Sequence, residues 1–432
     1  MIKIFLFFAT AFFCLNALAA QTLLTPEEAV HLALTQNFSM RLAQADADIA
    51  HQNNTAANAG LLPLVNLAVN ETFTLSAFQQ RLVNGNEFNA LGAPFNNLNG
   101  SVQASWVIYE GGRARFAKDR LQALDEQARL ALQAAVQQTT AQVLAAYYDV
   151  VRNRFQERAT EELIALNEER LRIAEARVAA GVAAQPDVLQ ARLDLNQLRA
   201  NLLQQQAITA ASKSVLNQLL ARAPQTPFEV ALRMDVAYAP DRERLLARAQ
   251  AESPLILALQ RGAEAAARAV DEANALRGPR ITANSQFIAL RTDNGAGFIR
   301  NNNQAGFAVG ASLALPLYNG GNLKRQADVA RIAAEQAVLR IEAQRLDLET
   351  AIENQLALFN AQQRMLALEN ENVQTARESL LISTERFRLG QTNALEVQAA
   401  QGALEQALLR QNLARFNLKM SEIQLRLLTA DL

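Results

Sequence analysis

The hydrophobic and polar residues of this chain follow two periods in a repeating order. Apolar and polar residues alternate in four short segments, residues 63–75, 100–109, 280–290 and 305–317. Alternation with a period of two is typical of β-strands with one apolar face, and only Glu71 interrupts that face in the first segment. Two much longer runs, residues 112–180 and 321–389, are rich in Ala, Gln, Leu, Glu and Arg. These residues favour helices, and each run predicts a helix of roughly 100 Å at about 1.5 Å per residue.

The two halves of the chain match one another. Gly181 and Gly390 end the long helical runs, and they are 209 residues apart. The same spacing holds without a gap from Tyr109 to Leu219, whereas Pro63 matches Pro279 at a slightly longer spacing. The change in spacing falls in the loops between, where insertions are tolerated. Such self-similarity indicates an internal duplication.

The duplication divides the chain into segments. We expect a signal segment at residues 1–20, a first repeat at 21–220, a linker at 221–244 and a second repeat at 245–432. Each repeat is predicted to run helix, strand, strand, long helix, turn, helix. The first helix is expected from Pro26 to about Leu61, and the last helices are expected at residues 182–220 and 391–429. The linker contains three prolines and one predicted short strand, Phe228–Leu232.

The first twenty residues have the pattern of a secretory signal peptide. Lys3 precedes an apolar run, and small residues follow up to Ala20. Cys14 lies inside the apolar run and is the only cysteine, so the exported chain is expected to lack thiols, disulfides and thiolate metal sites. His31 and His51 fit surface positions of an amphipathic helix better than a pair of metal ligands.

Composition argues against several function classes. The formal net charge is −1, which gives no basic patch for a nucleic acid. The sequence has no phosphate-binding glycine loop, nucleophile elbow or zinc-protease motif, so neither an enzyme nor a cofactor site is predicted. No segment after the signal offers eighteen consecutive apolar residues, so any membrane role would fall to the strands.

Strands of about ten residues can cross a bilayer when tilted, with one face toward lipid and one toward a lumen. From the strands alone, soluble hairpins with one face on a core explain the alternation equally well. If the strands do lie in a membrane, four of them cannot close a barrel, and open edges in lipid leave backbone groups without partners. Several copies of the chain would then have to share one barrel.

The order and doubled spacing of three motifs resemble the TolC family of outer-membrane efflux proteins. A Y-x-G-G motif ends the second strand of each repeat, R-x-x-x-G ends each long helix, and D-V-L-Q-A or E-V-Q-A-A follows. The resemblance covers essentially the whole exported chain. It implies a mainly α fold with a membrane β-barrel, in which a homotrimer forms one twelve-stranded barrel and an α-helical tunnel.

The resemblance also implies a location and partners. The barrel would lie in the outer membrane of a Gram-negative bacterium, in contact with its lipid, and the tunnel in the periplasm. The protein would be the passive outer conduit of a tripartite efflux or type I secretion system. It would receive substrate from a periplasmic adaptor (membrane fusion) protein and an inner-membrane pump. The alternative, an exported coiled-coil structural protein without a channel, explains the helices and the signal but not the duplicated strands.

Candidate site residues follow from the same resemblance. The adaptor is expected to dock at the hairpin tips, where the matching residues are Arg177, Gly181, Arg386 and Gly390. A plain turn signature is the favoured explanation of the two glycines and the alternative explanation of the two arginines.

Family tunnels narrow at the tip, and the matching constriction residues are Asp187, Phe387 and Glu396. Phe387 lacks the hydroxyl of the tyrosine found in the best-known family member, Thr392 replaces an arginine, and Ala399 replaces an acidic residue. Three copies of Glu396 are expected to meet on the axis and attract cations, with a solvated helix face as the alternative.

Aromatic residues mark the ends of the predicted strands. Trp106, Tyr109 and Tyr318 lie where the strands pass into the long helices. Tryptophan and tyrosine are enriched where a membrane meets water, so we expect these three residues at the periplasmic interface.

Overall fold

A computed structural model describes residues 23–296 and 299–432; the predicted signal peptide, residues 1–20, lies outside them. The described residues group into two compact units. One unit contains the residues up to Arg41 with Val136–Leu245 and Ile352–Leu432, and the other contains Leu42–Ala135 with Leu246–Ala351. The two longest helices, α3 (Arg113–Ala179) and α7 (Asn322–Arg388), contribute to both units and agree with the predicted runs. Within the described ranges, no helix combines the length and apolar character that crossing a membrane requires.

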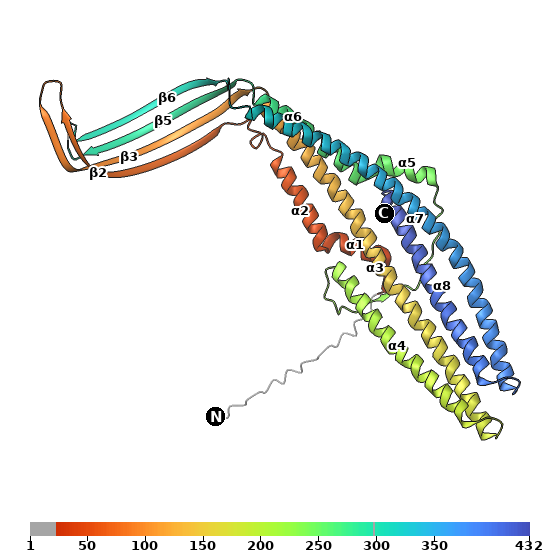
Figure 1. Cartoon of the computed structure of the whole chain (residues 1–432). Helices are drawn as coiled ribbons and strands as arrows, with labels where there is room; N and C mark the ends of the chain where they lie inside the picture. The colour runs from red at the N-terminus through yellow and green to blue at the C-terminus, as the bar shows by residue number, and fades with distance from the viewer. Residues whose placement is uncertain (1–22, 297–298) are drawn as a thin grey trace, which may run out of the picture. The chain divides into compact units, whose positions relative to one another are not determined.

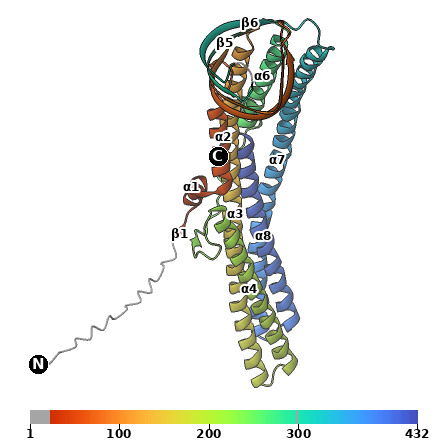
Figure 2. The ribbon, with the colours of Figure 1, turned by 90° about the vertical axis from the view of Figure 1, so that its left-hand side faces the viewer.

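Four antiparallel strands form one sheet in the order β2-β3-β5-β6 (Figure 1). They are β2 (Leu64–Arg81), β3 (Glu87–Glu110), β5 (Arg280–Asn294) and β6 (Asn301–Ala314). The strands come from both repeats, because β3 of the first repeat pairs with β5 of the second. Figure 2, which views the sheet from its end, shows that the sheet curves strongly. The outer strands β2 and β6 are its edges.

The register of the sheet explains why Glu71 interrupts the apolar face of β2. One row across the four strands is entirely apolar and consists of Leu67, Val102, Phe287 and Phe307. Further along the same face lies a row of Glu71, Leu98, Arg291 and Asn303. Glu71 therefore belongs to a row in which three of the four residues are polar or charged. The apolar residues form a band of limited height, and Phe307 on this band is 69% exposed.

The hairpin of β2 and β3 is longer than the sequence pattern predicts. The pattern indicates mainly a loop at residues 76–99, yet β2 continues to Arg81 and β3 begins at Glu87, with a bulge between Ser76 and Phe78. The prediction is wrong because backbone pairing between adjacent strands does not require alternating side chains. Strand β6 differs in the other direction and ends at Ala314, opposite the first residue of β5.

The predicted first helix is broken in two. It forms α1 (Pro26–Gln36) and α2 (Phe38–Asn53), with Asn37 between them in an extended conformation. The Asn37 side chain accepts a hydrogen bond from the amide of Ser39 at 2.7 Å and donates one to the carbonyl of Leu219 at 2.7 Å. This second partner is distant in sequence, so the helical period could not reveal the break.

The second repeat contains the same break. Its first helical segment forms α5 (Arg242–Glu252) and α6 (Pro254–Ala275). Ser253, between them, corresponds to Asn37 by the same spacing that relates the two matching prolines, and it also has extended backbone. Helix α5 begins at Arg242, inside the predicted linker of residues 221–244. The duplication extends to details of the backbone that the hydrophobic pattern does not show.

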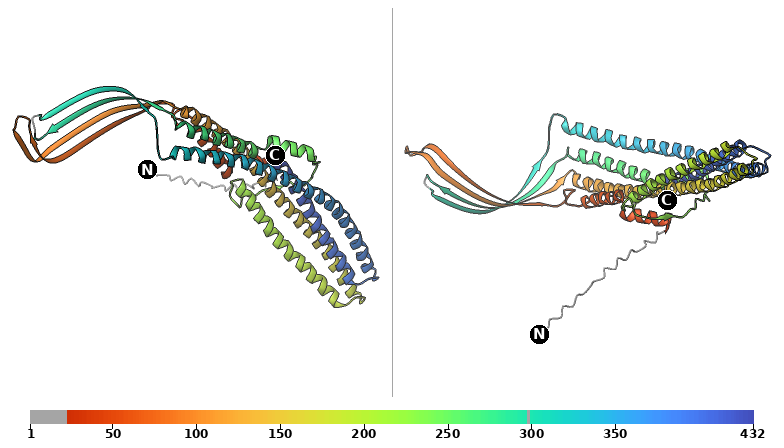
Figure 3. Two further views of the ribbon diagram at one scale, coloured as in Figure 1. Left: turned by 45° about the horizontal axis from the view of Figure 1, so that its top comes forward. Right: turned by 90° about the horizontal axis from the view of Figure 1, so that it is seen from below.

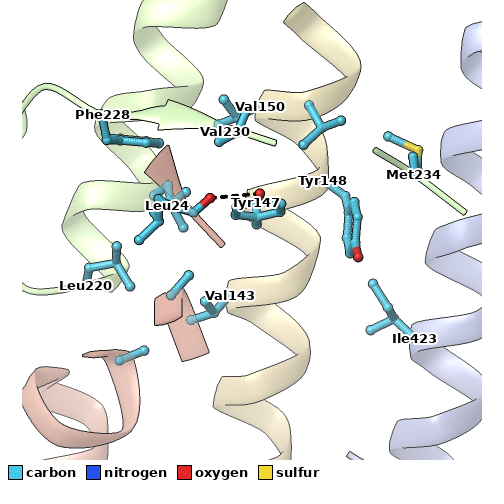
Figure 4. Close-up of a cluster of buried hydrophobic side chains, with 14 of the residues drawn as sticks. Leu24, Val143, Tyr147, Tyr148, Val150, Leu220, Phe228, Val230, Met234 and Ile423 are labelled. Carbon is cyan, nitrogen blue, oxygen red and sulfur yellow. Dashed lines mark hydrogen bonds between the residues drawn. The ribbon is translucent and has the colours of Figure 1, made fainter. Parts of the chain in front are cut away.

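A buried cluster joins the start of the described chain to the segment between the repeats. Strand β1 (Leu23–Leu24) pairs in parallel with β4 (Glu229–Val230), which lies inside the predicted short strand. Tyr147 of α3 is fully buried between them (Figure 4). Its hydroxyl donates to the carbonyl of Leu24 at 2.9 Å and accepts from the amide of Ala231 at 3.2 Å. One phenol thereby satisfies a backbone group on each of two segments.

The neighbouring Tyr148 predicts a loss of stability at alkaline pH. Burial, with smaller contributions from Tyr147 and Glu422, raises the pKa of its phenol to about 12. Because the folded pKa exceeds the ordinary value of 10, the stabilisation is complete below pH 10 and is lost as the pH rises toward about 12. Replacing Tyr148 by phenylalanine should weaken the alkaline loss of helical circular dichroism. The tyrosinate absorbance that the original protein shows and the variant lacks reports the ionisation of Tyr148. If that absorbance appeared near pH 10 while the helices stayed intact, the expectation would be wrong.

Candidate functional site at the ends of two helical hairpins

Two helical hairpins carry the predicted tip residues. Helix α4 (Gln185–Leu219) runs back along α3, and α8 (Ala394–Leu428) runs back along α7 (Figure 3). Gly181 and Gly390 lie in the two turns with φ of 72° and 75°, a conformation that residues with a side chain rarely adopt. The sequence pattern predicts both glycines at such turns.

The two turns close with the same hydrogen bonds. In the first, the amide of Gly181 donates to the carbonyl of Val178 at 3.0 Å, and the amide of Val182 donates to the carbonyl of Arg177 at 3.0 Å. In the second, the corresponding distances are 3.1 Å for Gly390 and 2.8 Å for the residue after it. This is the Schellman pattern, which satisfies the last carbonyl groups of a helix. The backbone is thus equivalent at the two tips.

The side chains at the two tips are not equivalent. Arg177 leaves its own hairpin, and its Nη1 donates to the carbonyl of Phe387 at 2.8 Å. Its guanidinium also lies 4.5 Å from the centre of the Phe387 ring, which is 1% exposed. A cation over an aromatic face is attracted to it, so Arg177 holds the two hairpin ends together.

Arg386, the repeat equivalent of Arg177, stays within its own hairpin. Its Nη1 lies 2.6 Å from Oε1 of Glu396, in the first turn of α8. The hydroxyls of Thr392 and Ser383 donate to the same carboxylate. The side chain of Asn393 caps α8 by accepting from the amide of Glu396 at 3.1 Å. The Glu396 carboxylate is therefore surrounded by donors from its own chain.

Asp187 has a different environment. It occupies the position equivalent to Glu396, in the first turn of α4 after Pro186. Among the residues that the structure describes, its carboxylate has no hydrogen-bond or ion-pair partner. The three donors to Glu396 have no counterpart here: Arg177 reaches Phe387 instead, and the residues equivalent to Thr392 and Ser383 are alanines. Of the two equivalent carboxylates, that of Asp187 is therefore the one available to an ion or a partner.

A buried polar cluster further along the hairpins is not predicted by the sequence pattern. Arg170 of α3 is 2% exposed, and its Nη1 donates to Oδ2 of Asp194 at 2.8 Å and to Oε1 of Gln401 at 2.9 Å. Gln398 also donates to the Asp194 carboxylate, at 3.3 Å. The cluster links α3, α4 and α8. In the sequence, Arg170 is one of many arginines in the same helical run, so the pattern does not distinguish it from the others.

The three predicted interface aromatics lie at one end of the sheet. The indole nitrogen of Trp106 donates to the carbonyl of Leu61 at 2.9 Å, which fixes its ring beside the start of β2. Tyr109 lies one residue before the end of β3, and Tyr318 follows β6. All three rings are exposed in the single chain, Tyr318 to 89%. No group of three or more His, Cys, Asp or Glu side chains within the described ranges is arranged to hold a metal ion.

Comparisons with known proteins place these features in context. The sequence profile of a family described as outer membrane efflux protein matches residues 29–222 and 245–431. The nodulation protein T of Rhizobium leguminosarum bv. trifolii is 24% identical over 394 residues, covering 87% of this chain and 79% of that protein. The outer membrane efflux protein BepC of Brucella suis is 25% identical over 62% of this chain and 58% of its own length.

The fold matches solved structures over most of the chain. The crystal structure of the outer membrane protein VceC from Vibrio cholerae superposes with a TM-score of 0.77 at 20% identity, covering 94% of this chain and 95% of that one. The structure of the outer-membrane channel OprN has a TM-score of 0.76 at 22% identity, with coverage of 94% and 90%.

Proposed function

The chain belongs to the outer membrane efflux protein family, and on this basis we propose that three copies assemble into one channel with a shared β-barrel and a helical tunnel. The protein is an outer-membrane efflux component. In the proposed assembly it is the passive conduit that continues from a periplasmic adaptor and an inner-membrane pump to the cell exterior.

The sheet carries this proposal. Its two edge strands present unpaired backbone groups, which in lipid must find partners at a cost of several kcal/mol for each group left unsatisfied. The apolar band of the sheet is open in the single chain, as Leu67 at 73% exposure illustrates. Both features are accounted for if β6 of one copy pairs with β2 of the next and the band faces lipid. The aromatic residues Trp106, Tyr109 and Tyr318 would then lie at the periplasmic interface.

Membrane fractionation tests the proposed function. The channel should resist extraction by salt and carbonate, and it should migrate as a trimer that heat converts into monomers. Purified protein reconstituted in a planar bilayer should conduct ions. A protein that washes off the membrane as a monomer would overturn the proposal and favour a soluble coiled-coil role.

The adaptor is proposed to dock on the hairpin tips. The turns at Gly181 and Gly390 have open space around them, since a side-chain carbon at Gly181 would meet no atom within 4 Å. Arg177 and Arg386 flank these turns, and both are in part engaged by their own chain. In this arrangement the arginines shape the docking surface, and the exposed backbone of the turns contacts the adaptor.

The constriction is proposed to use Asp187 and Glu396, with Phe387, which is 1% exposed, packing behind them in the core rather than lining the opening. Because Arg386 neutralises Glu396 within the chain, changing Glu396 to glutamine would leave the Arg386 cations unpaired around the opening. We expect block by multivalent cations in planar bilayers to weaken several-fold. The matched variant Asp187→Asn makes the same change in net charge without leaving an arginine unpaired, and it should also weaken block. Unchanged conductance and block in Glu396→Gln would remove Glu396 from the constriction.

A further inference from the structure

The chain contains one complete example of how neighbouring helices of the sheet-bearing unit pack. Helix α6 runs antiparallel to the first part of α3, and two ion pairs fix the register: Arg120 with Glu272 at 2.6 Å, and Arg261 with Glu126 at 3.0 Å. Next to the second pair, α6 comes close to α3 at Gly262, where a side-chain carbon would lie 3.2 Å from the amide of Gln127. This contact joins a helix of the second repeat to a helix of the first.

The duplication identifies a second pair of helices that correspond to α3 and α6. The spacing between the two tip glycines relates α3 to α7, and the longer spacing between the two matching prolines relates α2 to α6. Gln127 corresponds to Gln336 on α7, and Gly262 corresponds to Asp46 on α2. An amide and a carboxylate form a favourable pair, since the amide nitrogen donates and the carboxylate accepts.

Both corresponding helices carry an exposed apolar stripe at this level. On α7, Ile332 and Leu339 lie one helical turn on either side of Gln336 and are 56% and 62% exposed. On α2, Leu42 and Ile49 lie one turn on either side of Asp46 and are 67% and 59% exposed. Large side chains at such spacing form ridges that pack against another helix.

The other side of α2 is already occupied within the chain. Ala47 is 5% exposed, and His51 lies 3.2 Å from Asp125 of α3. The stripe of Leu42 and Ile49 is therefore a separate face. In the α3–α6 pair, the equivalent positions on α6 are Ala258 and Ala265, which are 5% and 4% exposed. The same positions are buried where the contact exists within the chain and open where it does not.

We propose that the face formed by Ile332 and Leu339 on α7 packs against Leu42 and Ile49 on α2 of the next copy. In the register carried over from α3 and α6, Leu339 faces Leu42, Ile332 faces Ile49, and Gln336 donates to Asp46. The inference rests on the proposed trimer and adds the residues of its helical seam. Leucine and isoleucine replace the small residues of the internal pair, so the helices should stand further apart at the seam.

Disulfide formation between two single-cysteine chains tests the seam. The only cysteine of the sequence, Cys14, lies in the predicted signal peptide, so introduced thiols have no competitor. Leu42→Cys and Leu339→Cys carried on chains with different tags, co-expressed and oxidised in membranes, should yield a disulfide-linked pair. The chains Ile49→Cys and Ile332→Cys should do the same.

Exchanging partners supplies the matched control. Leu42→Cys with Ile332→Cys shifts the register by about two helical turns, or about 10 Å along a helix, which is too far for a disulfide. We expect these exchanged pairs to cross-link at least about tenfold less than the facing pairs. Equal or greater yield from the exchanged pairs overturns the proposed register.

The outcome separates this inference from the proposed channel. If the protein runs as a heat-sensitive trimer but neither facing pair forms a disulfide, the seam is wrong and the trimeric channel stands. If the protein is a monomer in the membrane, both proposals fail.

Discussion

Replacing Arg170 by alanine is expected to destabilise the helical unit that contains it by about 3–5 kcal/mol. The side chain is 2% exposed, and its guanidinium donates to both Asp194 and Gln401. Without the cation, the Asp194 carboxylate keeps only amide partners in a largely buried position. The cost of a buried charge without its partner exceeds that of most single substitutions.

Unfolding by urea, followed through the helical circular dichroism of the detergent-solubilised protein, measures this effect. Arg172→Ala is the matched control on the same helix: its ion pair with Glu169 is 75% and 47% exposed, and we expect no measurable change. The double variant Arg170→Met with Asp194→Leu removes both charges together and should recover most of the lost stability. A loss of less than about 1 kcal/mol in Arg170→Ala would show that the pair does not stabilise the helices.

The sequence predicts the features that depend on residues close together in the chain and that occur in both repeats. The long helices, the strand pairs and the turns at Gly181 and Gly390 follow from period and from residues with special backbone freedom. The motifs, repeated at the same spacing in both halves, resemble those of one family, and the profile match shows that the chain belongs to it. In each case, residues close in sequence determine the structure, and the second copy reinforces the evidence of the first.

The features that sequence missed depend on partners distant along the chain. Asn37 lies at the break of the first helix, where its side chain reaches the distant Leu219, and the β2–β3 hairpin is extended by pairing rather than by pattern. Arg177 and Arg386 are equivalent in sequence, yet one crosses to Phe387 and the other pairs with Glu396. Thr392, which also donates to the Glu396 carboxylate, lies outside the matched motif.

The largest effect on partner binding is expected from a bulky residue in the hairpin turns. Changing Gly181 or Gly390 to leucine should reduce copurification of the adaptor at least about tenfold, equivalent to about 1.4 kcal/mol. The surrounding space is open, so the side chain projects outward instead of disturbing the packing; the nearest atom to a side-chain carbon at Gly390 is Nη2 of Arg177, at 3.8 Å. The added side chain then stands between the turn and the adaptor.

Backbone strain must be separated from obstruction, because every residue other than glycine is disfavoured at the positive φ of these turns. Gly181→Ala imposes the same backbone strain with little projection and should keep most adaptor binding. Gly85→Leu is the matched control in the β2–β3 turn, where φ is 88° and the space is equally open, and it should bind the adaptor normally. If Gly181→Ala lost as much binding as Gly181→Leu, the turn conformation rather than its surface would be what the adaptor requires. Retention of the adaptor by both leucine variants would remove the tips from the docking site, because a side chain in the contact would necessarily displace the partner.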